Sequence, residues 1–282
     1  MNVLLAYNPH AGSFRAELVK QLGEKLSAKG FTVHESDSHN PDLKNLATDC
    51  QHVCVIGGDG TLRDVIASLA HANPSITFSQ FPLGTINLVA REAGYKKDVA
   101  ALAERIAGRD AAKSYHIARS GDDIFLACAS VGPDAWSVDQ VSLKLKKRIG
   151  RLAYAAAFVG QFINWKRQTL HVQADGVSFT AEAAYILKGR YFGGPWTLSE
   201  TAALTNPKLS ILLLATARRR DFLRLMLSVM VSPKLGPGGC TRLECSEVTI
   251  TSDTEAPVQA DGDIVGQLPV HISANKEIVM FA

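Results

Sequence analysis

A glycine-rich segment carries the strongest chemical signal in the chain. An apolar run at residues 53–56 leads directly into Gly57, Gly58, Asp59, Gly60 and Thr61. Glycines between a strand and a helix let backbone N–H groups and the positive helix end approach a phosphate. The Thr61 hydroxyl can cap the helix and still donate to a phosphate oxygen. The segment predicts a phosphate-binding loop, and the alternative is a tight strand-to-helix turn without a ligand.

Asp59 sets this loop apart from the common nucleotide-binding motifs. A carboxylate would repel a bare phosphate, so Asp59 indicates either a bridging Mg²⁺ ion or a role in proton transfer. The loop lacks the Gly-Lys-Ser/Thr of a Walker A motif and the GxGxxG pattern of dinucleotide-binding folds. A different class of phosphate-binding protein is therefore indicated.

Three further segments complete a recognisable order along the chain. They are Asn-Pro-His-Ala-Gly at 8–12, Pro-Leu-Gly-Thr-Ile-Asn at 82–87 with Ala90-Arg91, and Gln-Ala-Asp-Gly-Asp at 259–263. Together with residues 57–62, this set resembles the signatures of the diacylglycerol kinase catalytic-domain family, which includes bacterial lipid kinases, sphingosine kinases and ceramide kinases. The resemblance spans most of the chain.

The resemblance implies a kinase of two domains with ATP in the cleft and its phosphates over Gly57 to Thr61. It further implies that the nucleotide pocket is lined by Asn8, Gly12, Gly84, Thr85 and Asn87, with Ser38 in place of a nucleotide-contacting threonine. Loops at the carboxyl ends of strands are where open α/β sheets bind ligands. For Asn8 and Asn87 the alternative is turn stabilisation, because asparagine readily bonds to nearby backbone.

Phosphoryl transfer also requires a carboxylate that receives the proton of the attacking hydroxyl. Asp261 and Asp263 are the candidates by similarity to the family's Asp-Gly-Glu element, and this chain has aspartate where glutamate is usual. The choice between them stays open, and a solvated Asp-Gly hairpin turn is the alternative. Asp134 resembles an acid of a Gly-Phe-Asp-Ala element and is a candidate to join Asp59 in a polar network, or is simply a loop acid.

Two positions depart from the family pattern. Leu88 stands where bacterial relatives often carry aspartate, and Asn206 stands where relatives with a structural magnesium show Asp-Gly. Loss of a charged ligand weakens a site for a hard cation. We therefore expect no structural metal, but we expect Mg²⁺ to accompany ATP, with Asp59 as its protein ligand.

The elements that must position these residues change in character near residue 113. Before it, short β-branched runs alternate with helical patterns, which predicts a Rossmann-like α/β domain over residues 1–115. After it, alternating strands and turn residues predict a β-rich sandwich over residues 116–274, interrupted by helices at 143–165 and 218–231. A final strand at 275–282 is expected to return to the first domain.

Composition limits the setting in which the protein works. The chain has 282 residues, 46% of them hydrophobic, and a net charge of +3, which is too small to indicate nucleic acid. The five cysteines form no Cys-x-x-Cys pair, and no signal peptide or membrane-spanning segment is expected, so the interpretation is a cytoplasmic protein. The oligomeric state stays open and includes a homodimer.

The expected acceptor is a lipid at a membrane surface, contacted peripherally at the inner face of the membrane. Two basic segments, 144–151 and 218–227, adjoin apolar helical patterns suited to anionic lipid, although each also fits an ordinary amphipathic surface helix. The enzymatic alternative is an NAD kinase, which shares the Gly-Gly-Asp-Gly-Thr loop. The alternative of another class is a nucleotide- or lipid-binding regulator without turnover, suggested by Leu88 and Asn206.

Overall fold

The computed structural model describes residues 1–69, 75–108, 112–139, 165–231 and 240–282. Within this part of the chain the residues separate into two units. Unit 1 comprises Met1–Tyr115 and Glu277–Ala282, and unit 2 comprises His116–Lys276. The helix expected at 143–165 and its basic cluster lie almost entirely outside the described residues.

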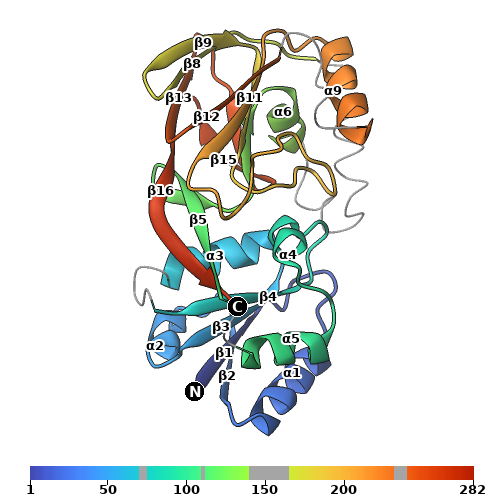
Figure 1. Cartoon of the computed structure of the whole chain (residues 1–282), viewed down its shortest axis with the longest axis vertical. Helices are drawn as coiled ribbons and strands as arrows, with labels where there is room; N and C mark the ends of the chain where they lie inside the picture. Colours follow the sequence, from blue (N-terminus) through green and yellow to red (C-terminus); the bar gives the residue numbers. More distant parts are fainter. Residues whose placement is uncertain (70–74, 109–111, 140–164, 232–239) are drawn as a thin grey trace. The chain divides into compact units, whose positions relative to one another are not determined.

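Parallel strands form the sheet of unit 1, in the order β2-β1-β3-β4 (Figure 1). Their bounds are Asn2–Tyr7 for β1, Thr32–Asp37 for β2, His52–Gly57 for β3 and Thr77–Pro82 for β4. β3 is buried along its whole length, as expected for a parallel strand covered on both faces. Tyr7 pairs with both Asp37 and Ile56, so the carboxyl ends of the strands meet at one edge.

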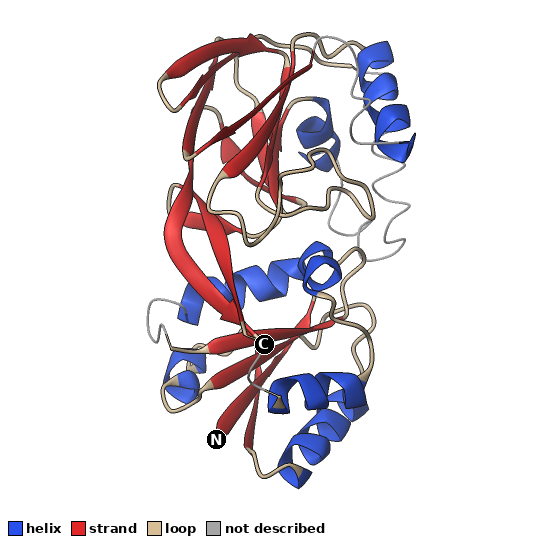
Figure 2. Ribbon diagram, viewed as in Figure 1, coloured by secondary structure: helices blue, strands red, loops and turns tan. Residues whose placement is uncertain are grey.

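Helices cover both faces of this sheet (Figure 2). They are α1 (Ala16–Ala28), α2 (Leu43–Ala47), α3 (Asp59–Leu69), α4 (Leu88–Ala93) and α5 (Val99–Ala107). In α3 the buried residues are Leu62, Val65, Ile66 and Leu69, whose spacing places them on one face of the helix. α1 packs on α5 on one face of the sheet, and α3 packs on α4 on the opposite face (Figure 1).

Unit 2 contains two antiparallel layers. One layer is β12-β11-β10-β7-β14-β15, and the other contains β16-β13-β8-β9 with β5 and β6 at its side. Val172, Val248 and Ile272 of one layer share a buried core with Ile186 and Ile211 of the other. The fold class predicted from the sequence, an α/β domain followed by a β-rich sandwich, is therefore confirmed.

The elements of unit 2 have the following bounds. The strands are β5 (Lys113–Ser120, which begins in unit 1), β6 (Asp123–Phe125), β7 (Cys128–Val131), β8 (Leu170–Ala174), β9 (Val177–Ala181), β10 (Ala183–Leu187), β11 (Leu209–Leu214), β12 (Cys240–Cys245), β13 (Glu247–Ser252), β14 (Pro257–Ala260), β15 (Asp263–Gln267) and β16 (Val270–Phe281). The helices are α6 (Pro133–Asp139) and α9 (Arg219–Val231). No helix among the described residues has the length and apolar character needed to cross a membrane.

Two apolar stretches of unit 2 are each divided between two strands. Residues 177–187 form β9 and β10, which belong to different layers. Glu182 lies at the break, where its carboxylate accepts hydrogen bonds from Arg167 and from the Ala217 N–H. Residues 123–130 likewise form β6 and the start of β7, with a break at Leu126 and Ala127 that matters for the site.

Candidate functional site

A hydrogen bond between side chains joins the loops that follow β1 and β3. The Asn8 Nδ2 donates to the Thr61 hydroxyl at 3.0 Å, while the Asn8 Oδ1 accepts from the His10 N–H at 2.9 Å. Because β2 lies on one side of β1 and β3 on the other, this contact sits where the strand order reverses, the usual ligand position in such sheets.

Thr61 differs from its predicted role in one respect. Helix α3 begins at Asp59, so Thr61 lies within the first turn and does not cap the helix. Its hydroxyl oxygen accepts a hydrogen bond from the Asn8 Nδ2, so the hydroxyl proton can be donated to another acceptor. The first α-helical bond runs from the Leu62 N–H to the Gly58 oxygen, so the Gly60 and Thr61 N–H groups lie at the helix N-terminus without an intrahelical acceptor.

Two glycines of the predicted pocket, Gly57 and Gly84, are packed too tightly for a side chain. A Cβ on Gly57 would lie 2.7 Å from the Thr61 Cβ, and one on Gly84 would lie 2.7 Å from the Gly58 Cα and 2.6 Å from the Asn87 Oδ1. The loops after β3 and β4 therefore touch through backbone atoms. Glycine is required here for close approach.

Asn87 and Asp59 connect the same two loops through polar atoms. Asn87 adopts the left-handed conformation with φ 53°, and its Nδ2 donates to the Gly84 oxygen at 2.7 Å. The Asn87 Oδ1 is buried without a hydrogen-bond partner among the described residues. The Asp59 carboxylate accepts from the Leu88 N–H at 2.7 Å and the Val89 N–H at 3.3 Å, so it holds the start of α4.

The other residues predicted to bind nucleotide lie around this edge. Ser38 directly follows β2, where its N–H donates to the Tyr7 oxygen at 2.8 Å, so it sits beside the end of β1. Gly12 and Thr85 are exposed, and a Cβ on Gly12 would meet nothing within 4 Å. The structure thus gathers the loops of all four strands, and nucleotide contact by these residues stays a prediction.

In unit 2, Asp261 is held by backbone amides. Its carboxylate accepts from the N–H groups of Leu126 at 2.7 Å, Ala127 at 2.8 Å and Cys128 at 3.1 Å. Its own N–H donates to the Cys128 oxygen, and its φ of 48° lies in the left-handed region, which aspartate tolerates better than most residues. Asp261 therefore fixes the hairpin turn between β14 and β15.

Asp134 belongs to a buried polar network that reaches this turn. The Ser130 hydroxyl donates to Asp134 Oδ2, the Gln259 amide donates to Ser130 at 3.0 Å, and the Gly262 N–H donates to Gln259 at 2.8 Å. Asp134 Oδ1 is buried without a partner among the described residues. Burial raises the pKa of Asp134 to about 6, although the bond from Ser130 acts in the opposite direction. A network of Asp134 with Asp59 stays a prediction.

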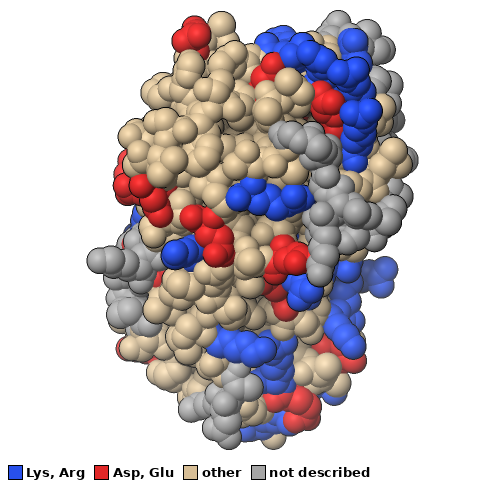
Figure 3. Space-filling view, turned by 45° about the horizontal axis from the view of Figure 1, so that its top comes forward, with Lys and Arg blue, Asp and Glu red and all other residues tan. Residues whose placement is uncertain are grey.

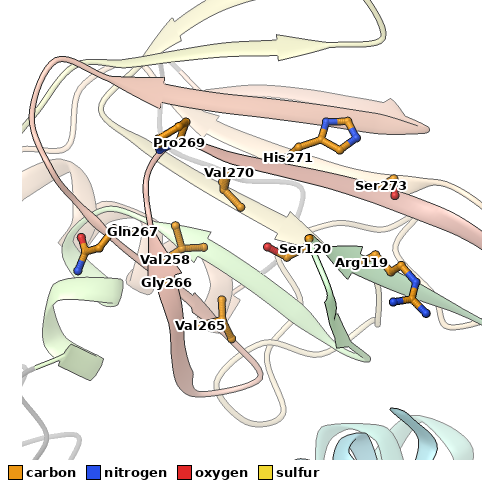
Figure 4. A pocket seen from close by; sticks show the side chains of 11 residues that line it. Arg119, Ser120, Val258, Val265, Gly266, Gln267, Pro269, Val270, His271 and Ser273 are labelled. Carbon is orange, nitrogen blue, oxygen red and sulfur yellow. The ribbon is translucent and has the colours of Figure 1, made fainter. Parts of the chain in front are cut away.

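Asp263 opens β15, and the same strand lines a cavity (Figure 4). The cavity has a volume of about 340 Å³. Val258, Val265 and Val270 converge on it beside Ser120, and Arg119 and His271 lie on its other side (Figure 4). The pairing of β14 with β15 skips Val265, which is a β-bulge, a feature that often redirects side chains near functional sites.

Lys188 is a polar residue of unit 2 that the sequence analysis did not identify. It is fully buried, and its ammonium group donates to the backbone oxygens of Asn206 and, at 3.4 Å, Ala203. Its N–H donates to the Ala127 oxygen at 2.9 Å, and the Ala127 N–H in turn binds Asp261. The sequence signal for this residue is a lysine directly after the apolar run at residues 183–187. A charged side chain at the end of a buried strand is rarely buried without partners.

The two departures from the family pattern have local structural roles. Leu88 is buried at the start of α4. Asn206 holds its loop through both ends of its side-chain amide. Its Nδ2 donates to the Thr201 oxygen and to Glu244, and its Oδ1 accepts from the Lys208 N–H at 2.9 Å. Within the described ranges, no three His, Cys, Asp or Glu side chains gather as metal ligands.

Comparisons with known proteins find two family models along the chain. The family model "Diacylglycerol kinase catalytic domain" matches residues 2–118, and the model "YegS C-terminal NAD kinase beta sandwich-like domain" matches residues 127–280. A probable YegS-like lipid kinase of Pseudomonas putida is 29% identical over 65% of this chain and 62% of its own length, so the match spans about three fifths of that relative. A diacylglycerol kinase of Bacillus subtilis is 22% identical over 94% of this chain and 90% of its own.

Solved structures show the same fold. The crystal structure of a diacylglycerol kinase from Bacillus anthracis str. Sterne is 16% identical and superimposes with a TM-score of 0.71 over 99% of this chain and 96% of its own. A second crystal structure from that organism gives a TM-score of 0.81 at 18% identity, over 99% of this chain and 94% of its own. At this identity the likeness shows the fold alone.

Proposed function

Because the chain belongs to the diacylglycerol kinase catalytic-domain family, we propose that it is an ATP-dependent lipid kinase. The acceptor is the hydroxyl of diacylglycerol or of a related long-chain lipid alcohol. The observation that carries the proposal is the joined pair of loops after β1 and β3, where Asn8 orients the Thr61 hydroxyl beside the N-terminus of α3. The proposed setting is cytoplasmic, at the inner face of a membrane.

The residues of this edge fit a triphosphate. Gly57, Gly58 and Gly84 leave no side chain between the loops and the ligand. The N–H groups of Gly60 and Thr61, the Thr61 proton and the positive end of α3 all favour an anion. The buried Asn87 Oδ1 is an acceptor that a ligand hydroxyl or amine would satisfy.

Magnesium fits this site only as an ion that arrives with ATP. Mg²⁺ usually keeps several waters and binds one or two carboxylates together with substrate phosphates, where it neutralises developing charge. Asp59 is the acid within the loop, but its carboxylate already holds Leu88 and Val89. In this proposal Asp59 therefore fixes the loop after β4 first and contributes at most one ligand.

For the proton transfer we favour Asp263 over Asp261. The Asp261 carboxylate is committed to three backbone amides, whereas Asp263 follows the turn that Asp261 fixes. In the reaction, the acceptor oxygen forms a bond to the γ-phosphorus, ADP departs, and the hydroxyl proton passes to the Asp263 carboxylate. Asp261 acts through Asp263 as a positioning residue.

The cavity along β15 offers a place for the apolar part of the acceptor. Val265 follows Asp263 by two residues, or roughly 7 Å along a strand. In this proposal, an alcohol whose chain lies against Val258, Val265 and Val270 presents its hydroxyl toward Asp263, at the start of the same strand. The volume is at the lower end of the range of ligand pockets, so it suits part of a lipid and not the whole.

The proposal is tested by supplying labelled ATP and Mg²⁺ with either diacylglycerol micelles or NAD, and by identifying the product that gains phosphate. We expect phosphatidate, a loss of at least about 100-fold in kcat for Asp263→Asn, and a normal melting temperature for that variant. Asp261→Asn should lower both kcat and stability. Equal activity of all three proteins would overturn the assignment of the acids.

NAD kinase remains the second candidate because the family model for unit 2 is described as NAD kinase-like. Transfer of the labelled phosphate to NAD and not to the lipid would establish NAD kinase activity. ATP binding without any product, using a mixed lipid extract as acceptor, would instead establish the regulator.

A further inference from the structure

Helix α9 has two faces of different character. Phe222 and Leu225 are buried, and the Trp165 ring packs edge-on against Phe222 with ring centroids 5.6 Å apart. This face anchors α9 to unit 2.

The opposite face exposes leucines between arginines. Leu223 is 45% exposed and Leu227 is 63% exposed, four residues apart. With about 100° of rotation per residue, they lie between Arg219 on one side and Arg220 and Arg224 on the other. All three arginines are exposed, and this outward face points away from Phe222 and Leu225.

The acid of the helix does not belong to this outward face. Asp221 accepts hydrogen bonds from the Thr216 hydroxyl at 2.8 Å and the Arg218 N–H at 3.2 Å, so it caps the start of α9. Its contact with Arg220 is longer, at 3.7 Å. Lys and Arg side chains accordingly gather over the end of unit 2 that carries α9 (Figure 3).

We infer that the outward face of α9 is the surface by which the protein docks on an anionic lipid bilayer. Leu223 and Leu227 enter the boundary between head groups and acyl chains, while Arg220 and Arg224 bind lipid phosphates. Exposed leucines framed by basic residues are the composition of helices that lie in the membrane interface. The inference deepens the proposed function, because a lipid kinase must reach a substrate held in a bilayer.

A protein partner is the less favoured occupant. Nothing in the described face offers an acidic or shape-specific contact, and its charge is of one sign. Long arginine side chains can remain with the head groups while their neighbours enter the apolar layer. Both properties suit a fluid anionic surface.

The test is co-sedimentation of the full chain with vesicles of phosphatidylcholine alone or mixed with phosphatidylglycerol. We expect binding that requires phosphatidylglycerol and weakens with salt. Leu223→Ser with Leu227→Ser should reduce the affinity at least about ten-fold. Arg220→Gln with Arg224→Gln should reduce it by about five-fold per arginine.

Matched controls come from unit 1, where Leu46 is 40% exposed and Arg15 is exposed. Leu46→Ser and Arg15→Gln should bind vesicles like wild type. Melting temperatures of all variants verify folding. Wild-type binding by both double variants, or no binding of wild type to either vesicle, would overturn the inference and leave a protein as the partner of this face.

A kinase assay separates this inference from the proposed function. Both double variants should phosphorylate a detergent-dispersed acceptor at the wild-type rate, yet lose activity on vesicles. A protein without kinase activity on any acceptor that still binds vesicles through α9 would refute the proposed function and support the docking surface.

Discussion

The side-chain amide of Asn8 donates to the Thr61 hydroxyl at 3.0 Å, and this bond orients the hydroxyl at the start of α3. We expect Thr61→Val to raise the KM for ATP by about ten-fold, since it removes a hydroxyl and leaves the Asn8 amide without this acceptor. Thr61→Ser keeps the hydroxyl and should restore most of the affinity. Steady-state kinetics at varied ATP provide the measurement, and similar KM values for both variants would contradict the role.

The contact between Gly58 and Gly84 predicts a strong difference between two glycine substitutions. Gly84→Ala places a Cβ 2.6 Å from Asn87 Oδ1 and 2.7 Å from the Gly58 Cα, so it should destabilise the protein by roughly 1–3 kcal/mol. Gly12→Ala meets nothing within 4 Å and should stay within about 0.5 kcal/mol of wild type. Urea unfolding checks both, and equal midpoints would show that the loops can separate without loss.

Lys188 should affect turnover more than nucleotide binding. Lys188→Met removes the donor to the carbonyls of Ala203 and Asn206, which should destabilise the protein by about 1–3 kcal/mol. Loss of these side-chain contacts should let the backbone at residue 188 shift, and its N–H donates to Ala127, whose own N–H donates to Asp261, so we expect kcat to fall while the KM for ATP is unchanged. Lys20→Met, at a side chain that is 69% exposed, is the control. A rise in KM alone would exclude a positioning role.

The raised pKa of Asp134 makes stability depend on pH in a defined direction. The folded protein holds this proton up to about pH 6, whereas the unfolded chain loses it near 3.8. Folded protein thus binds more protons between these values, so the contribution of Asp134 to stability falls as pH rises from about 4 to about 6. Above that range both states are ionised and the contribution is constant.

Asp134→Asn removes this dependence. The free energy of unfolding of the variant minus that of wild type should increase between pH 4 and pH 7, by at most roughly 3 kcal/mol. Urea titrations at a series of pH values give this difference. A difference that does not change with pH would show that Asp134 is ionised throughout.

Much of unit 1 could be predicted because its signals are local. The strand at 52–57, the glycines after it and the helix that ends at Leu69 follow one another within twenty residues, and the spacing of Leu62 and Ile66 places both on one buried face. The helix begins at Asp59, two residues before Thr61, where a cap was expected. That difference changes the assignment of Thr61 from a cap to a side-chain acceptor of Asn8.

Unit 2 was harder to predict because its decisive contacts are distant in sequence. The Asp261 carboxylate accepts a hydrogen bond from the Leu126 N–H, 135 positions away in the sequence. Hydrophobic periodicity does not predict which backbone amides will donate to a carboxylate. Glu182 gave no sign that it would divide a continuous alternating run between two layers. Lys188 similarly depends on carbonyl oxygens more than a dozen residues away.

The final residues of β16 complete the sheet of unit 1, where Met280 pairs with Thr77 and Phe281 with Phe78. Phe281 also packs on Tyr115, with ring centroids 4.9 Å apart. During synthesis, the apolar edge of unit 1 beside β4 therefore stays uncovered until residues 277–282 have left the ribosome. A nascent chain at that stage exposes a strand edge that chaperones would need to shield.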